Sequence, residues 1–164
     1  MNDAHEALEK MGKIFALLFG HMAKATVDRF GEEGRKAVVE GVTAFGRQRG
    51  EGIRERVLAQ GLPLTIENFY ANHDLAHVNA GFEMTLSIGK EWDAQALVTR
   101  CPFAEVWQEM GQPELGSIYC LVDEAMLEGY NPDLVLIRPT TIIRGHANCQ
   151  FIWQQKESGD AQVR

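Results

Sequence analysis

The sequence predicts an α+β fold, in which N-terminal helices pack on a small antiparallel sheet with one or two inserted helices. Three observations lead to this class. Apolar side chains recur at helical spacing through the first 60 residues. From Leu62 onward the pattern changes, and apolar residues alternate with polar ones as they do along half-buried strands. Short segments that begin at Pro and end near Gly then place helices among the strands.

Two helices are expected before Gly61, over residues 4–29 and 32–60. The first has Ile14 and Leu17 beside its main apolar stripe, so two of its sides are apolar. One side can face the domain and the other a partner subunit, which predicts a homo-oligomer with its contact in residues 1–29. Packing of both sides within the core of the chain itself fits the same pattern equally well.

The second half of the chain alternates strands and short helices. We expect residues 1–156 to form a single domain and residues 157–164 to form a disordered tail. The elements predicted here are strands at 82–88 and 92–100, helices at 102–111 and Glu114–Glu128, and an antiparallel pair of strands at 133–138 and 140–154.

Composition and charge exclude several classes of protein. The 164 residues include 16 basic and 23 acidic ones, for a net charge of −7, which repels a nucleic-acid backbone. The longest apolar run, Ile14–Phe19, is too short to cross a membrane. No signal peptide is visible, and three cysteines are an odd number for a disulfide framework. We therefore expect a cytoplasmic protein that binds a small molecule and neither nucleic acid nor membrane.

Arg49 occupies an inward position of the second predicted helix. It falls on the same apolar stripe as Phe45 and Ile53, and a buried guanidinium needs an anionic partner. Two interpretations remain open, a clamp for a substrate carboxylate and a structural salt bridge to a buried carboxylate. Glycines around it would let another backbone or a ligand come close: Gly46, Gly50 and Gly52.

Cys149 is the first candidate nucleophile. In a strand its side chain shares a face with Phe151 and Trp153, whereas His146 lies on the opposite, polar face. Unless a bulge at Gly145 resets the register, His146 is a surface histidine and a partner for Cys149 has to come from another element. Alternatively, Cys149 is a small buried side chain that only packs in the core.

The helix predicted over Glu114–Glu128 offers such a partner. Cys120 and Asp123 are three residues apart and so neighbours on one face, beside Gly116, which leaves room for a neighbour or a ligand. A buried carboxyl group tends to have a raised pKa and can then carry a proton during catalysis. Alternatively, Cys120 packs in the core and Asp123 caps the helix or is solvated.

His73 and His77 form a weaker alternative site. Their spacing of four residues would let both imidazoles bind one metal on a helix, which would make the protein a metal-dependent hydrolase. The surrounding residues are typical of a loop or strand, however, and the glutamate of a zinc-protease motif is absent. No phosphate-binding loop, nucleophile elbow or CxxC motif is present, so no cofactor is expected.

Four segments together resemble the L-2-amino-thiazoline-4-carboxylate hydrolase family: "FGRQRG", "CPFAEVWQEMGQPELGSIYCLVD", "YNPDLVLIRPT" and "GHANCQF". The resemblance covers roughly Phe30 to Trp153. It implies a small α+β enzyme that hydrolyses a carbon–nitrogen bond at an amidine- or guanidine-like carbon and opens an aminothiazoline ring toward a carbamoyl-cysteine. The residues that match the family by position are Arg49, Cys101, Cys120, Asp123, Asn131, Cys149 and Phe151.

The resemblance and the residues combine into one hypothesis. Cys149 acts as the nucleophile, Asp123 as the acid and base, and Arg49 binds the carboxylate of the substrate. Cys120 is the alternative nucleophile, and Asn131 is a candidate polar contact near the mouth of the pocket. The rival function is a non-catalytic domain that binds or senses a small ligand.

Overall fold

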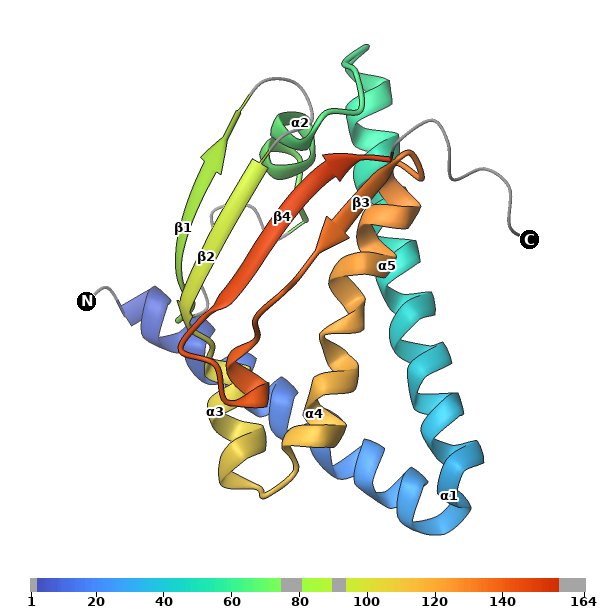
Figure 1. The fold of residues 1–164 in the computed structure, drawn as a ribbon, viewed down its shortest axis with the longest axis vertical. Coiled ribbons are helices and arrows are strands. Elements are labelled where there is room, and N and C mark those ends of the chain that lie inside the picture. The colour runs from blue at the N-terminus through green and yellow to red at the C-terminus, as the bar shows by residue number, and fades with distance from the viewer. Residues whose placement is uncertain (1–2, 75–80, 90–93, 157–164) are drawn as a thin grey trace.

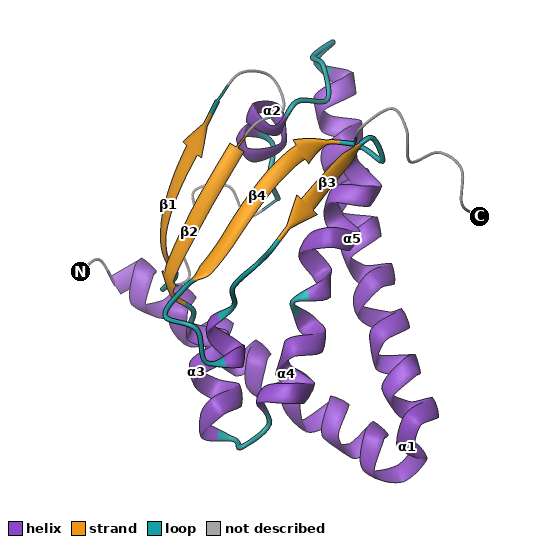
Figure 2. Ribbon diagram, viewed as in Figure 1, coloured by secondary structure: helices purple, strands orange, loops and turns teal. Residues whose placement is uncertain are grey.

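Helices lie on one side of a four-stranded sheet (Figures 1 and 2). The computed structural model describes residues 3–74, 81–89 and 94–156, apart from the side chain of residue 4. The predicted α+β class is confirmed. The elements are α1 (Asp3–Ala59), α2 (Ile66–Ala71), β1 (Glu83–Ile88), β2 (Ala94–Arg100), α3 (Pro102–Glu109), α4 (Pro113–Tyr119), α5 (Leu121–Tyr130), β3 (Leu134–Ile137), a short 3₁₀ turn (Ile142–Arg144) and β4 (Cys149–Gln155).

Helix α1 consists of two arms that meet at Gly31. The backbone of Gly31 has φ 58° and ψ −131°, a conformation that residues with a side chain rarely adopt. Figure 1 shows the arms diverging there, the first passing α3 and the second running beside α5. The predicted helices over 4–29 and 32–60 are therefore confirmed, with the break between them at a glycine.

The second arm of α1 and helix α5 approach each other backbone to backbone. A Cβ atom on Gly50 would lie 2.0 Å from the carbonyl oxygen of Met126, and one on Gly129 would lie 2.3 Å from that of Arg47. Glycine at these positions therefore permits the contact. The sequence suggested that a backbone or a ligand lies close to the glycines around Arg49. At Gly46 and Gly50 this neighbour is the backbone of α5.

The sheet has the order β1-β2-β4-β3, and all its strands are antiparallel. The predicted pairing of the last two strands is thus confirmed. Small residues on β2 face large ones on β4, with Ala96 opposite Phe151 and Ala94 opposite Trp153. These side chains pack with Ile53 and with residues of α2 and α5 to form the largest hydrophobic core cluster.

The prediction of one helix over Glu114–Glu128 is wrong, because the segment forms two helices that break at Cys120. Tertiary contacts account for the break. Arg138 donates a hydrogen bond to the backbone carbonyl of Cys120, at 2.9 Å, which satisfies a group that a continuous helix would have used. Gly116 leaves room for a neighbour, as expected, and that neighbour is the indole ring of Trp107.

The prediction of one long strand over residues 140–154 is also wrong in its first half. Residues 142–144 form the 3₁₀ turn, and Gly145 follows with φ 89°, so β4 begins only at Cys149. Burial drives this turn, because Ile143 packs into a cluster with Trp107 and Ala16. His146 is exposed, as predicted.

Two expectations concern the limits of the chain and its surroundings. The predicted disordered tail, residues 157–164, lies outside the described residues. Across the residues that are described, no helix combines the length and the apolar composition that crossing a bilayer requires.

The α1–α5 contact predicts opposite effects for two glycine-to-alanine substitutions in the same helix. In Gly50→Ala the new methyl group collides with the backbone of α5, and we expect a loss of about 2–3 kcal/mol in the free energy of unfolding. Gly41 is exposed and has no atom within 4 Å of its Cβ position, so Gly41→Ala should gain about 0.5–1 kcal/mol. Urea denaturation measures both, and equal effects would contradict the contact.

Candidate active site

Arg138 follows the end of β3 and connects the sheet to the first turn of α5. Its Nη1 donates to Oδ2 of Asp123 at 2.8 Å, and its Nη2 donates to Oε1 of Glu124 at 2.7 Å. Its guanidinium also lies over the ring of Phe151 on β4, 5.6 Å from the ring centre. Only 9% of the Arg138 side chain is exposed, so two carboxylates and one carbonyl bind a buried charge.

Asp123 is the titratable group at the centre of this arrangement. Burial raises its pKa to about 6, although the Arg138 guanidinium acts to lower it. The side chain nevertheless keeps 33% of its surface accessible to solvent. A carboxyl group with these properties can exchange a proton near neutral pH.

The three cysteines are all free and lie around Asp123. Cys149 begins β4, Cys120 lies between α4 and α5, and Cys101 caps the start of α3. The charge of Asp123 acts to raise the pKa of all three thiols, which places them near one carboxylate. The structure thus brings Cys149 close to the Cys120 and Asp123 pair, as the sequence suggested.

None of these thiols is stabilised as a thiolate. Burial raises the pKa of Cys101 to about 11 and that of Cys120 to about 12. It also raises the pKa of Cys149, but two groups oppose the shift there. The backbone N–H of Ile142 donates to the Cys149 sulfur at 3.2 Å, and the Arg138 guanidinium is nearby. Cys149 is the only one of the three that has both.

Arg49 projects from the second arm of α1 and binds Asp74. Its Nε and Nη2 donate to the two carboxylate oxygens of Asp74, each at 2.7 Å, and its guanidinium lies over the ring of Phe45. Arg49 is 14% exposed and Asp74 is 31% exposed. The guanidinium lowers the pKa of Asp74, so this carboxyl group stays ionised.

A hollow of about 310 Å³ lies beside this ion pair. Its charged side chains are Arg49, Arg56 and Asp74, so two cations face one anion. The anionic partner of Arg49 is therefore Asp74, with which it forms a salt bridge. Arg56 gives the hollow a net positive charge, which suits a carboxylate ligand.

Aromatic side chains connect the two groups of charges. Arg49 acts to lower the pKa of Tyr119, whereas Asp123 acts to raise it. Burial raises the pKa of Tyr70, and the charge of Asp123 adds to that shift. Tyr119 on α4 therefore lies near both Arg49 and Asp123, and Tyr70 on α2 lies near Asp123. Five elements thus contribute residues to one region: α1, α2, α4, α5 and β4.

Asn131 lies apart from this region, at the other end of α5. Its amide donates to the carbonyl of Leu64 at 3.1 Å, and its side-chain oxygen accepts from the backbone of Asp133 at 3.0 Å. It is 7% exposed. The oxygen thus stabilises the turn that leads from α5 into β3, and the amide connects this turn to the loop between α1 and α2.

The predicted metal alternative is only half described. His73 lies near Asp74, with 3.3 Å between Nδ1 and Oδ1, and burial lowers its pKa. His77 lies outside the described residues. Within residues 3–74, 81–89 and 94–156, no three histidine, cysteine or acidic side chains are placed to hold a metal ion.

Three residues of the candidate site were not predicted from the sequence. Arg138 ends the apolar segment "DLVLIR", where a charge after a buried strand is the signal that could have found it. Asp74 and Tyr119 carried weaker signals, because a loop aspartate and a tyrosine on a core stripe are both ordinary. Only the fold places them near Arg49.

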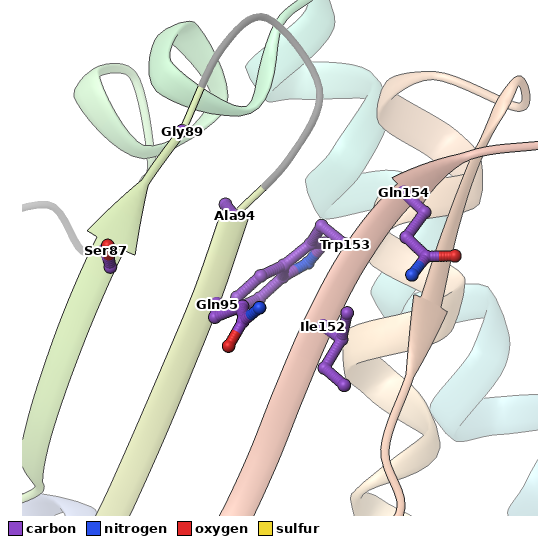
Figure 3. Close-up of a pocket in the computed structure, with 7 residues that line it drawn as sticks. All are labelled: Ser87, Gly89, Ala94, Gln95, Ile152, Trp153 and Gln154. Atoms are coloured by element: carbon purple, nitrogen blue, oxygen red, sulfur yellow. The ribbon is translucent and has the colours of Figure 1, made fainter.

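A second hollow, of about 420 Å³, lies at the far end of the sheet between β1, β2 and β4 (Figure 3). Among the residues that the structure describes there, the lining offers amides, a serine hydroxyl and apolar surface and no charged side chain. The lining residues are Ser87, Gly89, Ala94, Gln95, Ile152, Trp153 and Gln154. It shares no residue with the charged region around Asp123.

The Arg138–Asp123 pair predicts a pH-dependent cost for Arg138→Gln. Because the folded pKa of Asp123, about 6, lies above its ordinary value of 3.8, protonated Asp123 stabilises the fold, and this contribution is lost as the pH rises through 6. Arg138 limits that loss of stability, because its positive charge stabilises the ionised form of Asp123. We expect Arg138→Gln to lower the free energy of unfolding by about 2 kcal/mol at pH 8 and by clearly less at pH 5, as measured by urea denaturation.

Arg47→Gln is the matched control for this experiment. Arg47 pairs with Glu128 on the surface, where both side chains are about half exposed. Its loss should cost less than about 0.5 kcal/mol at either pH. A cost for Arg138→Gln that is equally small, or that is larger at pH 5, would contradict the role of the buried pair.

Comparison with known proteins agrees with the resemblance found in the sequence. A family model described as L-2-amino-thiazoline-4-carboxylic acid hydrolase matches residues 11–153. None of the curated proteins matches the chain significantly. The matched range is most of the 164 residues and includes Arg49, Asp74, Asp123, Arg138 and Cys149. The chain therefore belongs to the L-2-amino-thiazoline-4-carboxylic acid hydrolase family.

Proposed function

We propose that the protein hydrolyses a small cyclic amidine that bears a carboxylate, such as L-2-amino-thiazoline-4-carboxylate. One observation carries this proposal: a thiol, a carboxyl group with a pKa of about 6 and a guanidinium converge from separate elements, as Cys149, Asp123 and Arg49. The substrate has matching parts. Its amidine carbon is electrophilic, its ring nitrogen must gain a proton in order to leave, and its carboxylate needs a cation.

Cys149 is the proposed nucleophile and Asp123 its base. Because burial keeps the thiol protonated, Cys149 needs a neighbour that accepts its proton as the sulfur attacks. Asp123 is ionised above about pH 6 and can take this role. The Ile142 N–H and the Arg138 guanidinium then stabilise developing negative charge on the sulfur. Cys120 lacks the first of these contacts and remains the alternative nucleophile.

The proposed reaction has two stages. The sulfur of Cys149 bonds to the amidine carbon, its proton passes to Asp123, and the electron pair of the C=N bond moves to nitrogen. Asp123 returns the proton to the ring nitrogen. The lone pair of the exocyclic amino group then forms a C=N bond as the ring C–N bond breaks, and a proton from that amino group passes through Asp123 to the ring nitrogen, which leaves as a primary amine. The carbon stays attached to Cys149 and to the former ring sulfur as an imidodithiocarbonate. Water then adds to that carbon and the bond to Cys149 breaks, so the net change is one water molecule added across the C–N bond.

Arg49 is the proposed site for the carboxylate of the substrate. Asp74 already accepts hydrogen bonds from Nε and Nη2 of this guanidinium, so a substrate carboxylate has to replace Asp74 or share Arg49 with it. Arg56 lines the same hollow and adds a second positive charge. We assign Asn131 to the turn after α5 rather than to the substrate, because its polar atoms already form hydrogen bonds within the chain.

We place this reaction in the cytoplasm. The three cysteines are free, and thiol chemistry requires that Cys149 stay reduced. A reducing compartment provides that condition.

Cys149→Ser tests the nucleophile directly. The serine oxygen keeps the shape of the side chain but is a much weaker nucleophile, so turnover of L-2-amino-thiazoline-4-carboxylate should fall by at least about 100-fold. Turnover is followed by the primary amine that C–N cleavage releases. Cys101→Ser is the matched control, because serine preserves the cap of α3, and it should keep nearly full activity.

Three outcomes would count against this assignment. Full activity of Cys149→Ser would move the role to Cys120 or remove thiol chemistry. Release of a thiol in place of an amine would place the broken bond at the ring sulfur. Binding of the substrate without turnover by the wild-type protein would favour the non-catalytic ligand-binding domain.

Arg49 and Asp74 should affect KM in opposite directions. Arg49→Gln removes a charged hydrogen bond to the substrate, and we expect KM to rise about 10-fold with a smaller change in kcat. Asp74→Asn weakens the competing ligand, so KM should fall. Arg47→Gln, on the same helix, should leave KM unchanged. A lower kcat with constant KM in Arg49→Gln would show that Arg49 acts otherwise.

A further inference from the structure

The first arm of α1 is apolar on two opposite sides, and only one of them is covered. Ala16, Gly20 and Ala23 are buried, and Trp107 of α3 donates a hydrogen bond from its ring nitrogen to the carbonyl of Ala16 at 2.7 Å. The other side is exposed. Its large apolar side chains have the following exposed fractions: Leu8 38%, Met11 63%, Ile14 52%, Phe15 40%, Leu17 43%, Leu18 58% and Met22 62%.

Five of these residues follow the spacing of a coiled-coil seam. Leu8, Met11, Phe15, Leu18 and Met22 are separated by three, four, three and four residues, which is the a/d pattern of a heptad repeat. We call these five residues the apolar seam. Such spacing keeps one stripe of side chains facing a second helix over successive turns. Ile14 and Leu17 widen the stripe on one side.

The exposed area is that of a protein interface. Because a large side chain presents on the order of 200 Å², the seven exposed fractions correspond to roughly 700 Å². That is larger than the apolar patches found on most monomeric proteins, of about 300–600 Å². It approaches the area of about 800 Å² that each partner buries in a stable complex.

The chemistry of the arm favours a second helix over a lipid surface. A helix that lies on a membrane needs a charged face that stays in water opposite its apolar face. Here the opposite face carries Ala16, Gly20 and Ala23 and is buried against the rest of the chain. The charged residues Glu9 and Lys13 beside that face pair with Arg100 and Glu105 of the same chain, so the side opposite the exposed apolar residues contacts protein and not water.

We propose that the apolar seam pairs with the apolar seam of a second copy of this chain, in an antiparallel dimer. A twofold axis that crosses the arm between Phe15 and Leu18 sets these two residues against each other. The same axis sets Met11 against Met22, so each large side chain of the seam's centre meets an apolar neighbour. The seam is thus complementary to itself.

The proposed dimer interface would lie next to the aromatic side chains Phe103 and Tyr119 at the candidate active site. The ring of Phe15 lies 5.8 Å from that of Phe103 and 5.5 Å from that of Tyr119, between ring centres. Tyr119 in turn is within the electrostatic reach of Arg49 and Asp123. A second copy packed on Phe15 would therefore fix the aromatic wall from outside.

The test is the mass of the full chain in solution, by light scattering on a size-exclusion column over a range of concentrations. The wild-type protein should show twice the chain mass of 18.3 kDa at micromolar concentration. The double variant Met11→Lys/Leu18→Lys places two charges in the seam and should weaken dimerisation by at least about 100-fold, giving a monomer. Leu58→Lys is the matched control, because Leu58 is 51% exposed on the same helix, and it should stay dimeric.

Several outcomes would overturn the proposal. If the wild-type protein stays monomeric at all concentrations, the proposal is wrong, whether or not the protein binds phospholipid vesicles. If the double variant folds and remains dimeric, the proposal is also wrong. If the double variant fails to fold by circular dichroism, the single variant Met22→Lys replaces it, and persistence of its dimer at wild-type strength would again refute the pairing of the seam.

Discussion

The buried guanidinium of Arg138 is the contact on which the site depends. It binds the carbonyl of Cys120, the carboxylate of Asp123 and the carboxylate of Glu124, and it lies over the ring of Phe151. One side chain thereby fixes the break between α4 and α5 and ties it to the sheet. Without this charge, two acidic groups of the first turn of α5 would lose their counterion.

The rest of the frame keeps Asp123 partly accessible while raising its pKa. The glycines of α1 allow α5 to pack closely against α1. This contact brings Asp123 of α5 within electrostatic reach of Arg49 on α1. Cys149 enters from β4, on the same face as the core residues of the sheet. The proposed chemistry uses this convergence: a thiol that burial keeps protonated stands beside a carboxyl group that can accept its proton.

Much of this arrangement follows from residue patterns. Helical spacing predicted both arms of α1, alternation predicted the antiparallel strands, and the inward position of Arg49 predicted an anionic partner. Local sequence could not reveal the break at Cys120, because residues 113–130 keep their helical periodicity through it and a distant arginine stabilises it. The turn at 142–144 likewise depends on burial of Ile143 against Trp107, a contact between distant segments.

The most direct test is an NMR titration of the Asp123 carboxyl carbon in the wild-type protein, with the signal identified by its absence from Asp123→Asn. A pKa near 6 is predicted, because burial outweighs the attraction of Arg138. A pKa at or below the ordinary 3.8 would mean that the guanidinium holds Asp123 permanently ionised. In that case Asp123 could not return a proton to a leaving nitrogen, and the proposed acid and base role would be wrong.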